Sequence, residues 1–203
     1  MRNVLIGEMY NGYPLSESRK CNEGFRVDIL DDIKSLMEDM TKRHASVFFV
    51  RFDLRYPAVS APRYPDDNAL LKQFIENFRI YCKRHGYDPM YLWARECSGR
   101  DKVHYHFMLL LNGDIIQNAH ALIRGKATEL WQRCLGIEDG RGLVELCPIR
   151  EVPDYGGIKI RRKDLHFQQV FEKCYQWASY LAKRYTKGES PSYTNEYGRS
   201  HLR

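Results

Sequence analysis

The chain has 203 residues and a formal net charge of +6, and 43% of its residues are hydrophobic. This length and composition fit one globular domain that needs no disulfide or structural metal to fold, and the positive charge favours an anionic partner. Six cysteines occur without any CxxC pair, which argues against zinc fingers and disulfide scaffolds, and no apolar run is long enough to span a bilayer. We therefore expect a cytoplasmic protein with no membrane partner.

The first half of the chain predicts a helix, a strand and a second helix. Residues 1–26 form a polar arm, and apolar residues then recur at helical spacing from 27 to about Met40. The run VFFVRFDL (47–54) is rich in β-branched and aromatic residues and predicts a buried strand. Asp66 or Asp67 can cap the helix that follows, whose apolar stripe ends before Gly86.

The second half predicts a strand hairpin, a helix, a strand and a last helix. MYLWARE (90–96) and VHYHFMLLL (103–111) are close enough in sequence to form an antiparallel hairpin. A helix follows over about 115–135, and LVELCPI after Gly142 is typical of a short strand. The last helix is expected over about 164–187.

The predicted order is a helix, then β-α-β-β-α-β, then a helix, which favours an α+β fold with an antiparallel or mixed sheet. We expect one main domain over 27–187, between the arm at 1–26 and a flexible tail at 188–203 that has little to bury. Because one fold hosts many functions, the function has to be argued from the site.

His104 and His106 flank Tyr105 within a predicted strand. Side chains alternate with a period of two along a strand, so both imidazoles project from one face and can share a ligand. Such a pair suits a divalent ion that polarises a phosphodiester oxygen. The alternative is a pair of ordinary surface histidines, because so short a pattern often occurs by chance.

Glu96 ends the strand before the histidines and is a candidate third metal ligand. Symmetric pairing across CSGRDK would place Arg95 opposite His104, so Glu96 reaches the site only if the register shifts by one residue. The alternative for Glu96 is a solvated charge that pairs with Arg95 or Lys102.

Tyr180 and Lys183 are three residues apart in the last predicted helix and should share a face. A nearby ammonium or metal favours the phenolate needed for attack on phosphorus. Tyr180 lies nearly opposite the apolar stripe of this helix, where burial does not explain a large aromatic ring. Tyr185 falls on the stripe and is expected in the core, and Tyr175 at its margin is a weaker candidate nucleophile. Tyr180 is otherwise an exposed ring lying over lysine side chains.

Basic residues near the last helix are candidate DNA contacts: Lys159, Arg161, Arg162, Lys163 and Lys187. They can bind phosphates, and an exposed aromatic residue such as Tyr155 can stack on unpaired bases. The alternative is a solvated charged loop.

HYHFMLLLN preceded by WARE, together with YLAKRYTKG near the C-terminus, resembles the HUH endonuclease superfamily. The resemblance covers most of the chain and is strongest to the rolling-circle replication initiators of filamentous phages and their prophage relatives. It implies a ferredoxin-like sheet, Mg²⁺ or Mn²⁺ on His104 and His106, attack on DNA by Tyr180 and assistance by Lys183.

The same resemblance implies a 5′-phosphotyrosine intermediate in the nicking and rejoining of single-stranded or hairpin origin DNA. Its setting would be the cytoplasm of a bacterial host, with host helicase and polymerase as further partners. Some relatives carry two tyrosines one helical turn apart, but the position four residues after Tyr180 is Arg184. A single-tyrosine enzyme is therefore expected.

Two other functions stay open. One is a nonenzymatic nucleic-acid-binding or regulatory domain of the same fold, which the joint presence of both histidines and the Tyr-x-x-Lys unit argues against. The other is a metal-dependent phosphodiester hydrolase that uses the histidines without a tyrosyl intermediate. A third alternating histidine would favour that function, but position 108 is Met108.

Overall fold

In the computed structural model, residues 3–57, 64, 67–97, 103–147, 156–184, 191 and 193–202 are described. The helical elements are η1 (Arg19–Cys21), α1 (Val27–Arg43), α2 (Ala69–Arg84), the π-helical turn η2 (Ala121–Ala127), α3 (Thr128–Leu135), α4 (Phe167–Ser179) and the 3₁₀ turn η3 (Tyr180–Ala182). The short N-terminal strands are β1 (Val4–Leu5), β2 (Met9–Tyr10), β3 (Tyr13–Pro14) and β4 (Phe25–Arg26). The strands of the main sheet are β5 (Ser46–Arg55), β6 (Met90–Cys97), β7 (Val103–Asn112), β8 (Val144–Leu146), β9 (Ile158–Arg161) and β10 (Tyr197–Arg199).

The main sheet has the strand order β10-β6-β7-β5-β8, and β9 pairs with the other end of β5 beside β8. Each of these pairings is antiparallel. The chain order β5-α2-β6-β7-α3-β8 combined with this strand order is the ferredoxin-like β-α-β-β-α-β arrangement, so the predicted α+β class with a central antiparallel sheet is confirmed.

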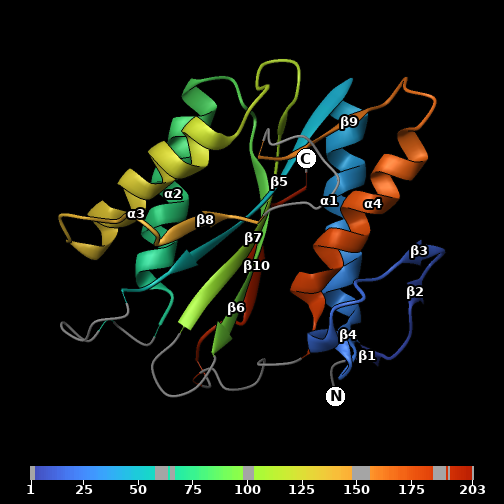
Figure 1. The fold of residues 1–203 in the computed structure, drawn as a ribbon, viewed down its shortest axis with the longest axis horizontal. Helices are drawn as coiled ribbons and strands as arrows, with labels where there is room; N and C mark the ends of the chain where they lie inside the picture. The colour runs from blue at the N-terminus through green and yellow to red at the C-terminus, as the bar shows by residue number, and fades with distance from the viewer. Residues whose placement is uncertain are drawn as a thin grey trace.

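Helices cover both faces of the sheet, with α2 and α3 on one face and α1 and α4 on the other (Figure 1). This explains why β5 is an almost continuous apolar run: both sets of alternating side chains are buried. Val47 and Phe49 point into the core under α1 and α4, while Phe48, Val50 and Phe52 point into the core under α2 and α3.

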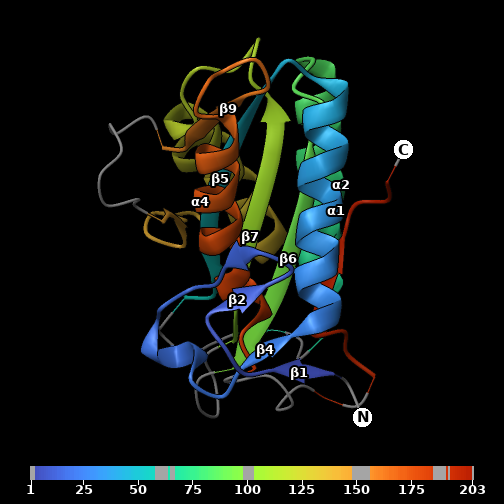
Figure 2. The same ribbon diagram turned by 90° about the vertical axis from the view of Figure 1, so that its right-hand side faces the viewer.

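The N-terminal residues differ from the polar arm that the sequence predicts. Residues 3–26 contain four short strands and η1, and Leu15 and Phe25 are buried in the core under α1 and α4. Figure 2 shows β1, β2 and β4 gathered at one end of α1 and α4. The few apolar residues of this polar segment are sufficient to anchor it, because they pack on a core that the rest of the chain builds.

The C-terminal residues also differ from the expected flexible tail, because β10 pairs with β6 at the edge of the sheet. Gly198 makes this approach possible: a Cβ atom there would lie 2.8 Å from Cζ2 of Trp93. Glu196 accepts a hydrogen bond from Arg26 Nη1 at 2.7 Å, which ties this segment to β4. Backbone pairing and the ion pairs Arg26–Glu196 and Arg199–Asp32 hold a segment that has little apolar surface of its own.

The last helix is shorter than the predicted 164–187, since α4 ends at Ser179 and η3 at Ala182. The Ser179 hydroxyl donates to the Gln176 carbonyl and accepts from the Ser16 backbone N–H. Lys183 then has extended backbone angles and pairs with Phe25. Pairing with the N-terminal segment therefore replaces the helix at the position where periodicity alone would continue it.

No helix in the described part of the chain combines the length and the apolar character needed to cross a membrane.

Candidate active site

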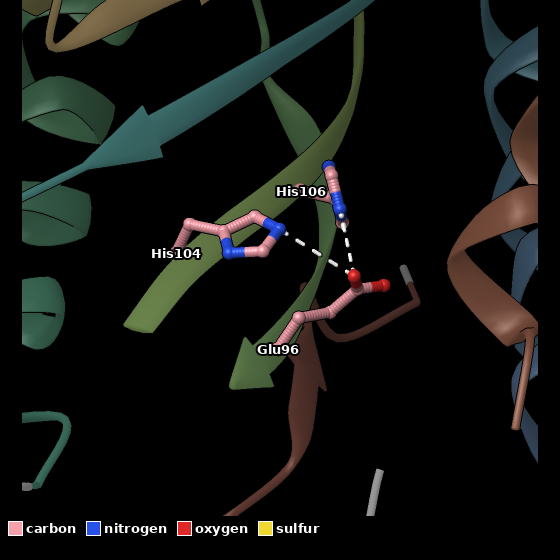
Figure 3. Close-up of side chains that lie close together, drawn as sticks. All are labelled: Glu96, His104 and His106. Carbon is pink, nitrogen blue, oxygen red and sulfur yellow. Dashed lines mark ion pairs between the residues drawn. The ribbon is translucent and has the colours of Figure 1, made fainter. Parts of the chain in front are cut away.

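Glu96, His104 and His106 meet on the face of the β6–β7 hairpin that α1 and α4 cover (Figure 3). Glu96 pairs with His104 in the ladder, so the register is shifted by one residue from symmetric pairing across CSGRDK, as the site requires. Glu96 Oε2 lies 3.4 Å from His104 Nε2 and 3.2 Å from His106 Nε2. One ligand atom from each residue fits within 4.8 Å of the others, which is a suitable spacing for one metal ion.

Asp53 holds His106 from the neighbouring strand. The two residues are partners in the β5–β7 ladder, and His106 Nδ1 lies 2.6 Å from Asp53 Oδ1. Burial would raise the pKa of Asp53, but the hydrogen bond from His106 and the charges of His106 and Arg51 lower the pKa below its ordinary value. Asp53 Oδ1 accepts a hydrogen bond from Nδ1–H, which leaves Nε2 as the ring nitrogen directed at Glu96. That buried Nε2 has no hydrogen-bond partner among the described atoms, although it faces Glu96.

The sequence pattern predicts β5 only as a buried strand and gives Asp53 no role in the site. Its pattern contains a signal, since Arg51 and Asp53 alternate within an otherwise apolar run and must share a face. Pairing β5 with β7 in register would have placed Asp53 beside His106. A hydrogen bond from a carboxylate to the second ring nitrogen is the usual support of a metal-binding histidine.

Tyr180 lies in η3, directly after α4, and its half-buried ring contacts His106. The two ring centroids are 5.3 Å apart and the rings are nearly perpendicular, at 82°. The side chain thus stands beside the proposed metal ligands rather than on a solvent-facing side of a continuous helix. Tyr175, the weaker candidate, is fully buried in the core under α1 and α4, where its hydroxyl donates to the Leu30 carbonyl.

Lys183 joins the tyrosine to the ligand group. Its fully buried ammonium lies 2.6 Å from Glu96 Oε1 and 3.4 Å from the centroid of the Tyr180 ring. Burial lowers the pKa of Lys183 to about 8, against the opposite effect of Glu96. Burial and the Glu96 charge raise the pKa of Tyr180, which outweighs the positive charges nearby. The expected neighbour relation is present, but the protein alone does not favour the phenolate.

Burial alone would raise the pKa of Glu96, but the adjacent His104 and His106 imidazoles and the Lys183 ammonium hold it far below its ordinary value. The carboxylate is therefore ionised and faces two imidazoles and one ammonium. One carboxylate oxygen and two imidazole nitrogens form a donor set that suits a divalent transition metal.

Among the basic residues predicted to contact DNA, Lys159 and Arg161 lie away from this site. Lys159 and Arg161 are on β9, which pairs with residues 46–49 at the opposite end of β5 from Asp53. Their partners in β5 are five to seven residues from Asp53, about 17 to 23 Å along the strand at ~3.3 Å per residue. Arg162 Nη1 donates to the Lys42 carbonyl at the end of α1, so this side chain has a structural role. Lys187, Tyr155 and Tyr185 lie outside the described residues.

Comparison with known proteins places residues 8–200 in one family model, the YagK/YfjJ C-terminal domain. The uncharacterized protein YfjJ of Escherichia coli (strain K12) is 26% identical over 77% of this chain and 86% of its own length. The uncharacterized protein YagK of the same organism is 26% identical over 74% of this chain and 82% of its own length. The match covers the candidate ligands, Asp53, Tyr180 and Lys183 in one stretch. The chain therefore belongs to the YagK/YfjJ C-terminal domain family.

Proposed function

We propose that this chain is a metal-dependent DNA endonuclease and strand transferase of the HUH type, a replication initiator that nicks and rejoins single-stranded origin DNA through Tyr180. The observation that carries the proposal is the contact between the Tyr180 ring and His106, whose Nε2 faces Glu96 and whose Nδ1 is held by Asp53. A nucleophile, a group of metal ligands and their support come from four separate segments of the chain and meet at one place. Ordinary core packing requires none of these residue types there.

Glu96, His104 and His106 would hold the ion, and the fit is supported by the unpartnered Nε2 of His106 and by the ionised Glu96. When bound, the ion would polarise a phosphate oxygen and stabilise the negative charge that develops at phosphorus. Mg²⁺ and Mn²⁺ both remain candidates. Two imidazoles among three donors favour Mn²⁺ in affinity, because Mg²⁺ prefers oxygen ligands.

Tyr180 attacks phosphorus and the P–O3′ bond breaks, which leaves a 5′-phosphotyrosine and a free 3′-hydroxyl. The phenol loses one proton and the departing 3′ oxygen gains one, so the step consumes neither water nor a nucleotide cofactor. One phosphodiester replaces another, and a 3′-hydroxyl can later reverse the reaction and rejoin the strand. Lys183 orients Glu96 through their ion pair and places positive charge against the Tyr180 ring, which opposes the rise in the phenol pKa that burial and Glu96 produce.

Single-stranded or hairpin DNA is the proposed substrate because attack in line with the leaving oxygen needs a deformable backbone. The net charge of +6 supports general affinity for the phosphates. A role in the cytoplasm of a bacterial host with helicase and polymerase as partners belongs to the same proposal and is supported by the sequence motifs alone.

The decisive experiment uses a pool of random single-stranded oligonucleotides, one half labelled at the 3′ end and the other at the 5′ end. Each half is incubated with the full chain and Mn²⁺ or Mg²⁺, and the products are separated on a denaturing gel. A 5′-phosphotyrosine retains the 3′ label on the protein and releases the 5′ label on a shortened fragment. We expect this asymmetry, and we expect excess chelator to abolish it.

The other outcomes identify the alternative functions. Metal-dependent shortening of both labelled pools with no label on the protein would indicate a hydrolase without a tyrosyl intermediate. Binding of the oligonucleotides with no cleavage under either ion would indicate a nonenzymatic nucleic-acid-binding domain. Retention of the 5′ label instead would reverse the polarity that we propose.

A further inference from the structure

Arg51 is a buried cation on β5 that the proposed chemistry has not used. It precedes Asp53 by two residues, so the two side chains leave the same face of the strand. The residue is only 5% exposed, and its guanidinium carbon lies 4.9 Å from the centroid of the Tyr180 ring and 5.3 Å from that of Trp177. Burying a charge is energetically costly unless neighbouring groups bind it, so the position of Arg51 needs an explanation.

The first contact of Arg51 fixes the end of α4. Arg51 Nη1 donates to the Trp177 carbonyl at 2.9 Å, and α4 ends two residues later at Ser179. Carbonyls in the last turn of a helix have no partner within the helix, and a charged donor is a strong substitute. Arg51 therefore anchors to the sheet the helix end from which Tyr180 follows.

The second contact holds the ring itself. Lys183 lies 3.4 Å from the ring centroid of Tyr180 and Arg51 lies 4.9 Å from it, so two cations contact one phenol. Lys183 is paired with Glu96, while Arg51 Nη1 donates to a neutral carbonyl. The guanidinium thus contacts the Trp177 carbonyl and the rings of Trp177 and Tyr180.

We infer that Arg51 is a positioning residue for the nucleophile: it holds the Tyr180 ring against His106 by binding the end of α4 and by lying against the ring. The catalytic part of this inference rests on the proposed function, and the structural part rests on the contacts of Arg51. Lysine cannot replace arginine fully, because an ammonium lacks the planar surface that lies against a ring while one N–H binds a carbonyl.

The structural part can be tested without DNA or metal. The full chain is labelled with 3-fluorotyrosine, and the ¹⁹F resonance of Tyr180 is the one lost in Tyr180→Phe. We expect this resonance to move and broaden in Arg51→Met and in Arg51→Lys, because the ring loses its support. Arg95→Lys is the matched control: Arg95 is also a buried arginine, but it lies on the other face of the sheet, where it donates to Asn68. The control should leave the Tyr180 resonance in place.

The catalytic part is measured as the single-turnover rate of covalent adduct formation beside the dissociation constant for the same oligonucleotide. A misplaced nucleophile should slow the adduct step by about 10- to 100-fold in Arg51→Met, with DNA affinity within about 3-fold of the unmodified chain. Arg51→Lys should recover part of the rate because it keeps the charge and one donor, and Arg95→Lys should stay within about 3-fold.

An unchanged Tyr180 resonance in both Arg51 variants would overturn the inference, as would an equal displacement in Arg95→Lys. If Arg51→Met fails to fold, the Arg51→Lys comparison still decides. If the unmodified chain forms no adduct, the proposed function fails, while the ¹⁹F comparison still tests whether Arg51 positions Tyr180.

Discussion

The two faces of the β6–β7 hairpin both contain buried polar residues, but they use them differently. On the face under α2, Arg95 and Tyr105 are partners in the ladder and are almost fully buried. On the face under α1 and α4, their sequence neighbours Glu96, His104 and His106 converge on one point. The same two strands therefore allow a comparison between a set of polar residues that stabilises the fold and a set that can bind a metal ion.

The two faces differ in how their buried polar groups are arranged. Under α2, Asn68 Oδ1 accepts from Arg95 Nη1 at 3.3 Å and from Tyr105 Oη at 3.1 Å, and Asn68 Nδ2 donates to the Asn195 carbonyl. Asn68 thus links Arg95 and Tyr105 through hydrogen bonds, as in an ordinary buried network. On the other face, His104 Nε2 and His106 Nε2 converge on one oxygen of Glu96, at 3.4 and 3.2 Å, while Lys183 pairs with the other oxygen. Three potential metal donors thus surround one point, an arrangement that suits a bound cation.

The largest expected effect in this comparison is the loss of the nucleophile. Tyr180→Phe removes one hydroxyl from a half-buried ring, so covalent adduct should be abolished while the melting temperature changes little. Tyr175→Phe is the matched control on α4, because it removes the hydroxyl that bonds the Leu30 carbonyl. It should cost about 0.5–1.5 kcal/mol of stability and leave the adduct intact. Adduct on a denaturing gel at the normal level in Tyr180→Phe would exclude Tyr180.

A further variant tests whether Tyr180 or Tyr185 is the nucleophile, since the sequence pattern predicts Tyr185 as a core residue. Tyr185→Phe should retain cleavage with at most a modest loss of stability. If adduct disappears in Tyr175→Phe or Tyr185→Phe and persists in Tyr180→Phe, the nucleophile is that other tyrosine.

The second effect concerns the ligands themselves. Replacing both His104 and His106 by Ala removes two of the three donors, so metal-dependent cleavage should fall below detection. Binding of single-stranded oligonucleotides should be largely spared, because general affinity depends on basic side chains elsewhere. Gel-based cleavage and fluorescence anisotropy on the same preparation measure the two quantities. Normal cleavage by this double variant, or by the unmodified chain in excess chelator, would remove the metal assignment.

A third effect compares a hydrogen bond that holds a metal ligand with a hydrogen bond on the opposite face of the hairpin. Asp53→Asn should weaken Mn²⁺ binding by about 10- to 100-fold in calorimetric titration, because the amide no longer fixes the His106 tautomer. Tyr105→Phe removes a hydrogen bond to Asn68 on the opposite face and should cost about 0.5–1.5 kcal/mol of stability with unchanged Mn²⁺ affinity. Equal losses of Mn²⁺ affinity in both variants would show that Asp53 acts only through the general stability of the hairpin.

The sequence predicts the parts of this molecule that depend on local pattern. Strand alternation places His104 and His106 on one face, and the order of strands and helices predicts the α+β class, which the structure confirms. Register is different: whether Glu96 or Arg95 faces His104 depends on a one-residue shift that no local pattern determines. Asp53 and Arg51 were missed for a related reason, because their meaning depends on which strand lies beside β5.

The ends of elements were also beyond local pattern. Apolar periodicity continues past Ser179, but the hydrogen bond from Ser16 and the pairing of Phe25 with Lys183 end the helix there. These contacts join residues more than 150 positions apart, so helical propensity carries no information about them. The same holds for β10, which becomes a strand because the edge of β6 is available and Gly198 can pass over Trp93.

The smallest expected effect concerns the basic residues that the sequence predicts as DNA contacts. Lys159 and Arg161 lie about 17 to 23 Å along β5 from Asp53, and Lys159 Nζ already donates to Gln117 Oε1 at 2.5 Å. Replacing Arg161 and Lys163 by Ala should leave the single-turnover rate at saturating DNA unchanged and weaken affinity by a few-fold at most. If both side chains bind phosphates of a longer strand, the slope of log affinity against log salt should fall by about 1 to 2. Anisotropy titrations with short and long oligonucleotides at several salt concentrations measure this slope. A large loss of the saturated rate would mean that the far end of the sheet takes part in the chemistry, contrary to the separation that the strand register gives.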